Sequence, residues 1–490
     1  MPPRLAPRPA RPKGPGRWPV ILSFPSLLLA ACASVPGPVA TDLPPEVPTQ
    51  WSAAAARAGA AATDLTAWWR RFDDPALVAL VTTSLNANAG VKSAQAALRQ
   101  ARALADVARA GLGPSASLSG SAQRSQSGSS DAGNTFTAGL GARWEPDVFG
   151  GQRAAVDASV TDALASAATL SNVQVALAAE VASSYITLRG QQARLAIARS
   201  NLATQTQTLQ ITRWRAQAGL VSSLDVAQAV SAAEQTRAQI PALQTSVTQT
   251  LNALAVLTGQ APGALNGSLG DATPIPPAPA DLALAFPADT LRQRPDVRAA
   301  ELKLRSAWSR VAMADAARYP SFSLSGSLGL SALSLGRLTD SASLVRSLLA
   351  SVSAPLFDGG AAQAQVRAQD AVLDQARASY QDTVLGALQD VEDALVAIQG
   401  DRERLARLQA AATAAGNAEL LARQRYQSGL IDFASVLGTQ RTLLTAQDSV
   451  ASTQASLSAS HVQLYRALGG GWTPEAEAAA APRAANARGL

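Results

Sequence analysis

Two stretches of this 490-residue chain, at about residues 152–218 and 361–428, contain no proline and hardly any glycine. At about 1.5 Å per residue, each is long enough for one helix of roughly 100 Å, whereas an average helix has about 11 or 12 residues. In the first stretch, valine or leucine recurs at every seventh position: Val181, Leu188, Leu195, Leu202 and Leu209. The second repeats this spacing with Val384, Val391, Ile398 and Leu405. Heptads of this length predict coiled-coil packing of long helices, and an aromatic content of only 4% suits close-packed helices.

The same pattern, a proline followed by a Gly-Gly pair, precedes both long stretches. A proline and a Gly-Gly pair stand before the first in "WEPDVFGGQRAAV" (residues 144–156) and before the second in "SAPLFDGGAAQAQV" (residues 353–366). The residues that mark these strand-to-helix transitions are Pro146, Gly150, Gly151, Pro355, Gly359 and Gly360. Gly150 and Gly359 lie 209 residues apart, and the segments around them match as well. The chain is therefore predicted to contain two copies of one unit.

Short runs with a two-residue period precede each Gly-Gly pair. In "TFTAGLGARW" (residues 135–144) and "SFSLSGSLGL" (residues 321–330), large apolar side chains alternate with small or polar ones. Weaker examples are "SASLSGSA" from Ser115 and "SLLASVSA" from Ser347. Each run has about 8 to 10 residues, which fits a tilted membrane β-strand. The alternative for any one run is a half-buried strand of a soluble sheet, but four runs in two hairpins flanked by helices favour the membrane.

The N-terminus resembles a bacterial signal peptide. Five basic residues come before the first acid, Asp42, and the apolar run "VILSFPSLLLAA" is too short for a permanent membrane helix. The run ends in "LLAAC", which resembles a lipoprotein signal and makes Cys32 the expected site of a covalent lipid; several acyl chains anchor a protein firmly. In lipoproteins of this kind, a residue other than aspartate after the cysteine, here Ala33, permits export to the outer membrane. A buried or incidental cysteine is the alternative.

These patterns divide the chain into six parts. Each copy of the unit is expected to run helix, two strands, very long helix, sharp turn and long helix, and the proline-rich segment "TPIPPAPA" at 273–280 joins the copies. The predicted parts are a signal peptide (1–31), a lipidated tether (32–75), a first repeat (76–272), a proline-rich linker (273–285), a second repeat (286–470) and an alanine-rich tail (471–490).

Charge and composition exclude several classes of protein. The formal charge of +6 suggests a nucleic-acid partner. Without the leader, however, the chain has 36 of its 41 basic residues and 35 acidic ones, so its charge is nearly balanced and no such partner is predicted. Cys32 is the only cysteine and His461 the only histidine, which excludes intrachain disulfides and a His-rich metal site. There is no phosphate loop and no nucleophile motif, so we expect neither enzyme activity nor any cofactor besides the lipid.

Four predicted strands cannot close a barrel by themselves. In lipid, an open sheet edge leaves N–H and C=O groups unpaired at several kcal/mol each. Other chains must therefore complete the barrel, and three copies with cyclic symmetry would give about twelve strands. The strands would form a pore through the outer membrane, and the long helices a tube that hangs into the periplasm.

Several segments carry a resemblance to a known family: "RQRPDVRAAE" (292–301), "RYPSFSLSG" (318–326), "APLFDGG" (354–360), "RYQSGLIDF" (425–433) and "YRALGGGW" (465–472). Over about residues 68–470 the chain resembles the TolC-like outer-membrane efflux proteins, in the OprM/NodT-like lipoprotein branch that serves RND-type pumps. The resemblance implies a mainly α fold with membrane β-strands: a homotrimer whose outer-membrane β-barrel of about twelve strands continues into a periplasmic α-helical coiled-coil barrel. It also implies a passive conduit for small molecules that docks to a periplasmic adaptor (membrane fusion) protein and an inner-membrane RND pump.

The gate of this family lies where two helical hairpins turn at the periplasmic tip. In this chain the turns are expected at Gly219 and Gly429. The resemblance makes four nearby residues gate candidates, namely Asp225, Asp432, Tyr426 and Arg425. Family members often carry further aspartates on the second hairpin, where this chain has Ser435 and Gly438, and this departure argues against a doubled acidic ring.

Helix capping is the alternative role of the two acids. The sequence "SSLD" can form a capping box from Ser222 to Asp225, and Asp432 can cap the return helix. Both roles stay open, and one residue can serve in both. In the gate hypothesis, a hydrogen bond from the Tyr426 phenol to the Asp225 carboxylate between adjacent hairpins, joined by Arg425, holds the tunnel shut.

Two other classes of protein share parts of this pattern. A lipidated periplasmic adaptor also has coiled hairpins, but one hairpin that interrupts soluble β domains is expected there, rather than two beside membrane-type strands. A type I secretion outer-membrane channel would share the fold, and a neighbouring gene for an ATP-driven exporter would indicate it.

Overall fold

The structure is a computed structural model that describes residues 47–48, 51, 65–279 and 287–472, all within one compact unit, Pro38–Leu490. The predicted signal peptide, Cys32 and the greater part of the alanine-rich tail lie outside the described residues. Both halves show the expected order of long elements.

The first half contains η1 (Trp68–Phe72), α1 (Pro75–Ala87), α2 (Ala89–Ala110), β1 (Ser115–Ser125), β2 (Gly133–Trp144), α3 (Gly151–Gln217), α4 (Ser223–Leu257) and α5 (Asn266–Leu269). The second half contains α6 (Pro287–Gln293), α7 (Pro295–Ala316), β3 (Ser321–Ala332), η2 (Leu335–Arg337), η3 (Ser341–Ser343), β4 (Leu344–Ser353), α8 (Ala361–Gln427) and α9 (Phe433–Ala467).

The two very long helices are confirmed. Both α3 and α8 have 67 residues, which corresponds to roughly 100 Å at the usual helical rise. The heptad residues point into the contacts between helices: Val181 and Leu188 on α3 and Val384 and Val391 on α8 are fully buried. By length and composition α3 also contains a window apolar enough to span a membrane, but half of that window is buried inside the unit, as expected for a helix within a bundle.

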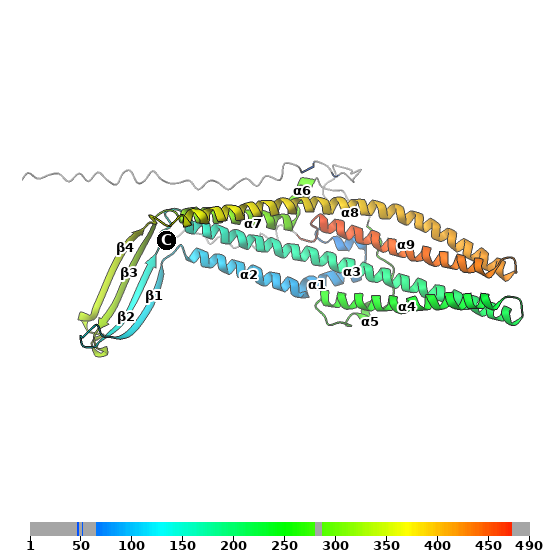
Figure 1. Cartoon of the computed structure of the whole chain (residues 1–490), viewed down its shortest axis with the longest axis horizontal. Helices are drawn as coiled ribbons and strands as arrows, with labels where there is room; N and C mark the ends of the chain where they lie inside the picture. Colours follow the sequence, from blue (N-terminus) through cyan, green and yellow to red (C-terminus); the bar gives the residue numbers. More distant parts are fainter. Residues whose placement is uncertain (1–46, 49–50, 52–64, 280–286, 473–490) are drawn as a thin grey trace, which may run out of the picture. The chain divides into compact units, whose positions relative to one another are not determined.

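The helices form a layer in which α3 is central. Near the sheet, α3 packs between α2 and α7, and α7 packs on α8. Towards the opposite end, α4 and α9 run back along α3, and α9 also packs on α8 (Figure 1). Where these segments meet, Trp68 stacks on Tyr465 with 5.2 Å between ring centroids, inside the largest buried cluster of the described residues. The layer therefore places the sheet at one end of the helices and the two hairpin turns at the other (Figure 1).

The four strands form one antiparallel sheet in the order β1-β2-β3-β4. The two hairpins are joined at the centre, where Leu140 of β2 lies opposite Leu328 of β3. Within the described residues β1 pairs only with β2, and β4 only with β3. Both outer strands consequently present an open edge.

Arg294 forms hydrogen bonds that join three helices. Its side chain is almost fully buried, and Nη2 donates to the carboxylates of Asp296 (2.7 Å) and Asp390 on α8 (3.0 Å). Nη1 donates to the backbone carbonyl oxygens of Ala387 (3.3 Å) and Ala467 (3.0 Å). One guanidinium therefore joins the start of α7 to the middle of α8 and the end of α9.

The charge of Arg294 controls the protonation of its neighbour. Burial by itself raises the pKa of Asp296, but the hydrogen bonds and charge of Arg294, with the backbone N–H of Val297, outweigh burial and hold this pKa below its ordinary value of 3.8. A carboxylate with a lowered pKa stabilises the fold at pH values above its unfolded pKa. This contribution is lost as the pH falls through the folded-state pKa, below 3.8.

We predict that Arg294→Met lowers the free energy of unfolding by about 3 kcal/mol at neutral pH, because two carboxylates lose their cationic partner. Thermal or urea denaturation of the purified protein measures this difference. Lys303→Met is the matched control, since Lys303 is an exposed cation on α7, the helix that Arg294 precedes. The difference between Arg294→Met and the parent should shrink as the pH falls below 3.8, and an equal difference at low pH would contradict the assigned ion pairs.

Candidate functional site

The sheet has one hydroxyl-rich face. The odd-numbered positions of all four strands share this face, and most of them are serine, threonine or glycine. The hydroxyl groups pair across the strands, with 2.7 Å between the oxygens of Ser121 and Thr137, of Ser323 and Ser351, and of Ser327 and Ser347. Arg143 is the one charged residue on this face of the described strands, and it forms an ion pair with Glu145. The face is therefore polar but almost uncharged.

The opposite face is apolar. Exposed leucines lie on all four strands: Leu118, Leu140, Leu324, Leu328, Leu344 and Leu348. Aromatic rings gather where the strands meet the helices: Phe149 stacks on Tyr319 (5.0 Å between centroids) and on Phe322 (6.4 Å), and the indole N–H of Trp144 donates to the carbonyl of Leu112. An apolar face with aromatic rings at its border is typical of a membrane-facing sheet.

The predicted Gly-Gly transitions lie between β2 and α3 and between β4 and α8. Gly150 and Gly360 have φ values of 81° and 86° and immediately precede α3 and α8. A side chain at either position would be strained in this left-handed conformation. Gly359 also has positive φ, Gly151 is the first residue of α3, and Pro146 and Pro355 lie in the connecting segments.

Two aspartates that the sequence reasoning missed cap the long helices. The Asp147 carboxylate accepts hydrogen bonds from the backbone N–H groups of Gln152 and Arg153, and Asp358 accepts from those of Gly360 and Ala362. The missed signal was an acid just before a helix start, a typical N-terminal capping pattern. These caps fix the direction in which each long helix leaves the sheet.

The tip turns lie at the predicted glycines. Gly219 and Gly429 have φ values of 73° and 75°, and the next residues, Leu220 and Leu430, donate backbone hydrogen bonds to Arg215 (2.8 Å) and Arg425 (2.9 Å). This pattern is a Schellman helix end, for which glycine is favoured. The two hairpins consequently turn in the same way.

Both acidic gate candidates cap helices within the chain. Asp225 completes a capping box with Ser222, the N-cap residue of α4, and Asp432 accepts a hydrogen bond from the backbone N–H of Ser435 at 2.9 Å. Hydrogen bonds from Ser435 lower the pKa of Asp432. Capping is therefore the role that these residues have inside one chain, while their role as a gate stays a prediction.

Tyr426 joins the two hairpin tips. Its ring is buried against Phe433 (5.6 Å between centroids) and lies 4.6 Å from the guanidinium carbon of Arg215. Arg215 comes from the other hairpin and donates to the carbonyl oxygens of Tyr426 (2.7 Å) and Gln427 (2.6 Å) at the end of α8. A cation that binds the last carbonyls of a helix stabilises that helix end.

Sequence reasoning named Arg425 as a gate candidate and did not single out Arg215, which makes the contact within the chain. Arg425 is exposed, whereas its counterpart Arg215 binds the opposite hairpin. The Tyr426 hydroxyl has no hydrogen-bond partner among the described residues, and the Asp225 carboxylate bonds to Ser222 instead. A basic residue in the last turn before a C-terminal glycine was a signal for Arg215, but Arg425 has the same signal.

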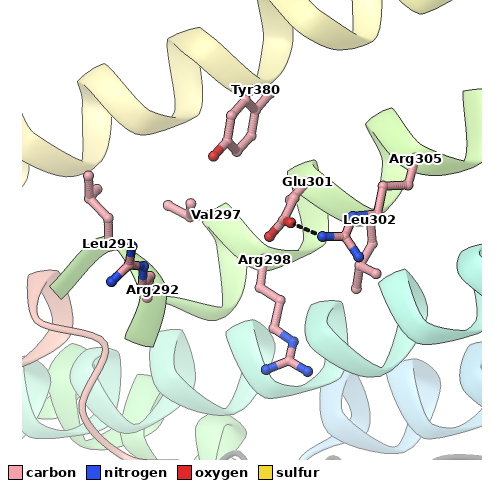
Figure 2. Close-up of a pocket in the computed structure, with 8 residues that line it drawn as sticks. All are labelled: Leu291, Arg292, Val297, Arg298, Glu301, Leu302, Arg305 and Tyr380. Atoms are coloured by element: carbon pink, nitrogen blue, oxygen red, sulfur yellow. Dashed lines mark hydrogen bonds and ion pairs between the residues drawn. The ribbon is translucent and has the colours of Figure 1, made fainter. Parts of the chain in front are cut away.

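A separate cavity of about 220 Å³ lies among α6, α7 and α8 (Figure 2). Arg305 donates to the Glu301 carboxylate at 2.6 Å, and Tyr380 reaches from α8 towards α7 (Figure 2). Burial and then the negative charge of Glu301 raise the pKa of Tyr380. Within residues 65–279 and 287–472, no group of three or more His, Cys, Asp or Glu side chains is placed to hold a metal ion. The paired charges of this cavity give it no evident chemistry.

Comparison with known proteins gives matches along nearly the whole chain. The family model of the outer membrane efflux protein matches residues 80–260 and 286–470. The antibiotic efflux pump outer membrane protein ArpC of Pseudomonas putida is 32% identical over 465 residues, which cover 92% of this chain and 95% of ArpC. The pyoverdine export outer membrane protein OpmQ of Pseudomonas aeruginosa is 33% identical over 461 residues, 91% of this chain and 95% of OpmQ. The solved structure of the outer-membrane channel OprN has a TM-score of 0.83 and 34% identity, and covers 88% of this chain and 98% of its own.

Proposed function

Because this chain belongs to the outer membrane efflux protein family, we propose that three copies of it form the passive outer-membrane conduit of a tripartite efflux system. The chain is an outer-membrane protein whose helices extend into the periplasm. The observation that carries the proposal is the four-stranded sheet, which has one apolar face, one hydroxyl face and two open edges.

The open edges set the number of copies. In lipid the free N–H and C=O groups of β1 and β4 need partners, and cyclic pairing of β4 with β1 of the next copy supplies them. Two copies would give a barrel of about eight strands, whose interior is filled by side chains. Three copies give about twelve strands and leave an aqueous pore.

The helical layer has matching edges. Its outermost helices beside the sheet are α2 and α8, and both carry exposed apolar side chains: Leu104 and Val107 on α2, and Val372, Leu385 and Val396 on α8. Contact of α8 with α2 of the next copy would bury these residues. One rotation therefore completes both the sheet and the helical layer.

We expect the purified protein to form particles of about three chains in detergent and to give unitary current steps in a planar bilayer. Light scattering corrected for bound detergent measures the first property, and single-channel recording measures the second. A stable monomer with full β content would contradict both the number of copies and the barrel.

The tip offers a surface for a partner in the periplasm. Leu220 and Leu430 are each 73% exposed, and Leu224 and Trp214 beside them are exposed as well. Apolar side chains exposed together at one end of a molecule mark an interaction site. We assign this surface to the helical hairpins of an adaptor that links the conduit to an inner-membrane RND pump, and the pump supplies the energy for transport.

Contacts at the tip hold the conduit closed in our proposal. Arg215 binds the last carbonyl groups of α8. The four gate candidates, Asp225, Asp432, Tyr426 and Arg425, lie around the same turns. The Tyr426 phenol and the Asp225 carboxylate would meet between copies. An adaptor opens such a gate only if it binds the open state more tightly than the closed state.

We predict that Arg215→Gln, and separately Asp225→Ala combined with Tyr426→Phe, raises single-channel conductance and makes cells leak to large antibiotics. Each lost charge-assisted hydrogen bond shifts the balance towards the open state by about 1.5 kcal/mol or more, roughly tenfold. Arg213→Gln is the control, because Arg213 is an exposed arginine on the same helical turn. If Asp225 is only a cap, its loss lowers stability by about 1 kcal/mol with unchanged conductance, and such a result in an intact trimer would contradict the gate.

The N-terminus would add a second attachment to the membrane. We propose that Cys32 is lipidated after removal of residues 1–31, since "LLAAC" ends the apolar run of the leader. Mass spectrometry of protein from native envelopes should find acyl chains on residue 32. An intact Met1 would contradict this proposal, whereas Cys32→Ser should weaken anchoring or processing without preventing trimer assembly.

A further inference from the structure

The apolar face of the sheet carries two arginines, and both lie near the end that is remote from the helices. Arg124 is on β1 and Arg346 on β4, and the pairing of Ala122 with Phe136 and of Leu328 with Arg346 places them on the leucine face. Every other side chain on this face of the four described strands is uncharged. A pair of cations on a surface that meets lipid needs an explanation, because charges near the middle of a bilayer are costly and are tolerated near its surface.

The stagger of the strands gives the depth of both arginines. In the register of the sheet, Ala332 at the end of β3 lies opposite Phe136, and Leu344 at the start of β4 lies opposite Leu330. The outer ends of β1 and β2 lie opposite each other, and from β2 to β4 the ends are displaced in one direction, as expected for strands tilted in a barrel. Depth is therefore counted from the outer end of each strand. Arg124 is one residue, and Arg346 two residues, from that end, which places both at the outer membrane surface.

Neither guanidinium is neutralised within the described chain. Both side chains are exposed, and neither has a hydrogen-bond or ion-pair partner among the described residues. The acids of the outer loops, Asp131 and Asp340, form no ion pair with them. The opposite end of the same face has aromatic rings and no cation, so the two borders of the apolar face are chemically different.

We propose that Arg124 and Arg346 bind the phosphate groups of lipopolysaccharide in the outer leaflet of the outer membrane. A guanidinium offers a planar fork of N–H groups that suits phosphate oxygens, and a long side chain near the end of a strand reaches the lipid head groups while its stem stays in the apolar layer. Phosphate supplies the negative charge that the sheet itself lacks on this face.

If the ring closes as proposed above, the lipid site would also join neighbouring copies. This second role rests on the proposed function. Pairing of β4 with β1 of the next copy brings Arg346 of one chain and Arg124 of the next to the same seam. A phosphorylated lipid at the seam would then contact two copies and hold them together. We therefore expect the lipid to stabilise the trimer as well as to coat it.

The test uses the full-length protein and purified lipopolysaccharide, either intact or dephosphorylated. The primary measurement is lipid bound per chain, and the secondary one is the temperature at which the oligomer dissociates. Intact lipopolysaccharide should bind and raise this temperature, and the dephosphorylated form should bind much more weakly. In Arg124→Gln combined with Arg346→Gln, the affinity for intact lipopolysaccharide should fall by about 30-fold. Arg143→Gln removes an arginine from the hydroxyl face of the same sheet and should bind as the parent does.

Three results would overturn the inference: equal binding of the two lipid forms by the parent, unchanged affinity in the double variant, or an equal thermal effect of inorganic phosphate. The first needs no variant, so a folding defect cannot obscure it. A monomer that binds intact lipopolysaccharide through these arginines would contradict the proposed trimer and leave the lipid site standing. A conducting trimer that is indifferent to the phosphates would contradict the lipid site alone.

Discussion

The structure depends on one requirement, which is that backbone N–H and C=O groups inside a membrane must find partners. Within one chain, β2 and β3 meet it on both sides, and β1 and β4 meet it on one side only. Several kcal/mol for each unpaired group is more than the net stability of many domains can absorb. The chain is therefore incomplete as a monomer in lipid, and its duplicated plan supplies two hairpins for each copy of a closed ring.

The sheet sets the direction in which the long helices begin. Each long helix begins directly after a left-handed glycine, and Asp147 and Asp358, just before these glycines, bind backbone N–H groups at the start of α3 and α8. Each helix therefore begins in a fixed direction from its strand. Over roughly 100 Å a small error in this direction would separate the tips widely. Polar contacts along the path limit such errors: Arg194 on α3 forms an ion pair with Asp448 on α9 at 2.6 Å, and Gln440 donates to Thr208. These contacts hold α3 to α9, and α9 in turn packs on α8.

Features with a strong local period were predictable from the sequence, and contacts between distant segments were not. The heptads gave the long helices to within about one residue, the two-residue alternation gave both faces of the sheet, and Gly219 and Gly429 marked the turns. Arg294 was noticed only as part of a motif, because its partners Asp390 and Ala467 lie 96 and 173 residues away. Arg215 was missed for a related reason: its repeat counterpart Arg425 precedes the more conspicuous Tyr426, and only the packing of one tip on the other decides which arginine faces inward.

The two repeats differ at the tip, and this difference allows the duplicated hairpins to bind each other. Two identical tips that face each other would place like residues together, and two arginines would repel rather than bind. Here the first tip contributes the cation Arg215, and the second contributes the ring of Tyr426 and the carbonyl end of α8, where the first repeat has Ala216 in place of the tyrosine. Each hairpin needs its turn and its cap for its own folding, and both repeats have them. Gly219 corresponds to Gly429, and both α4 and α9 have an N-terminal cap. The two repeats thus differ at Ala216 and Tyr426, and the contact between their tips is complementary.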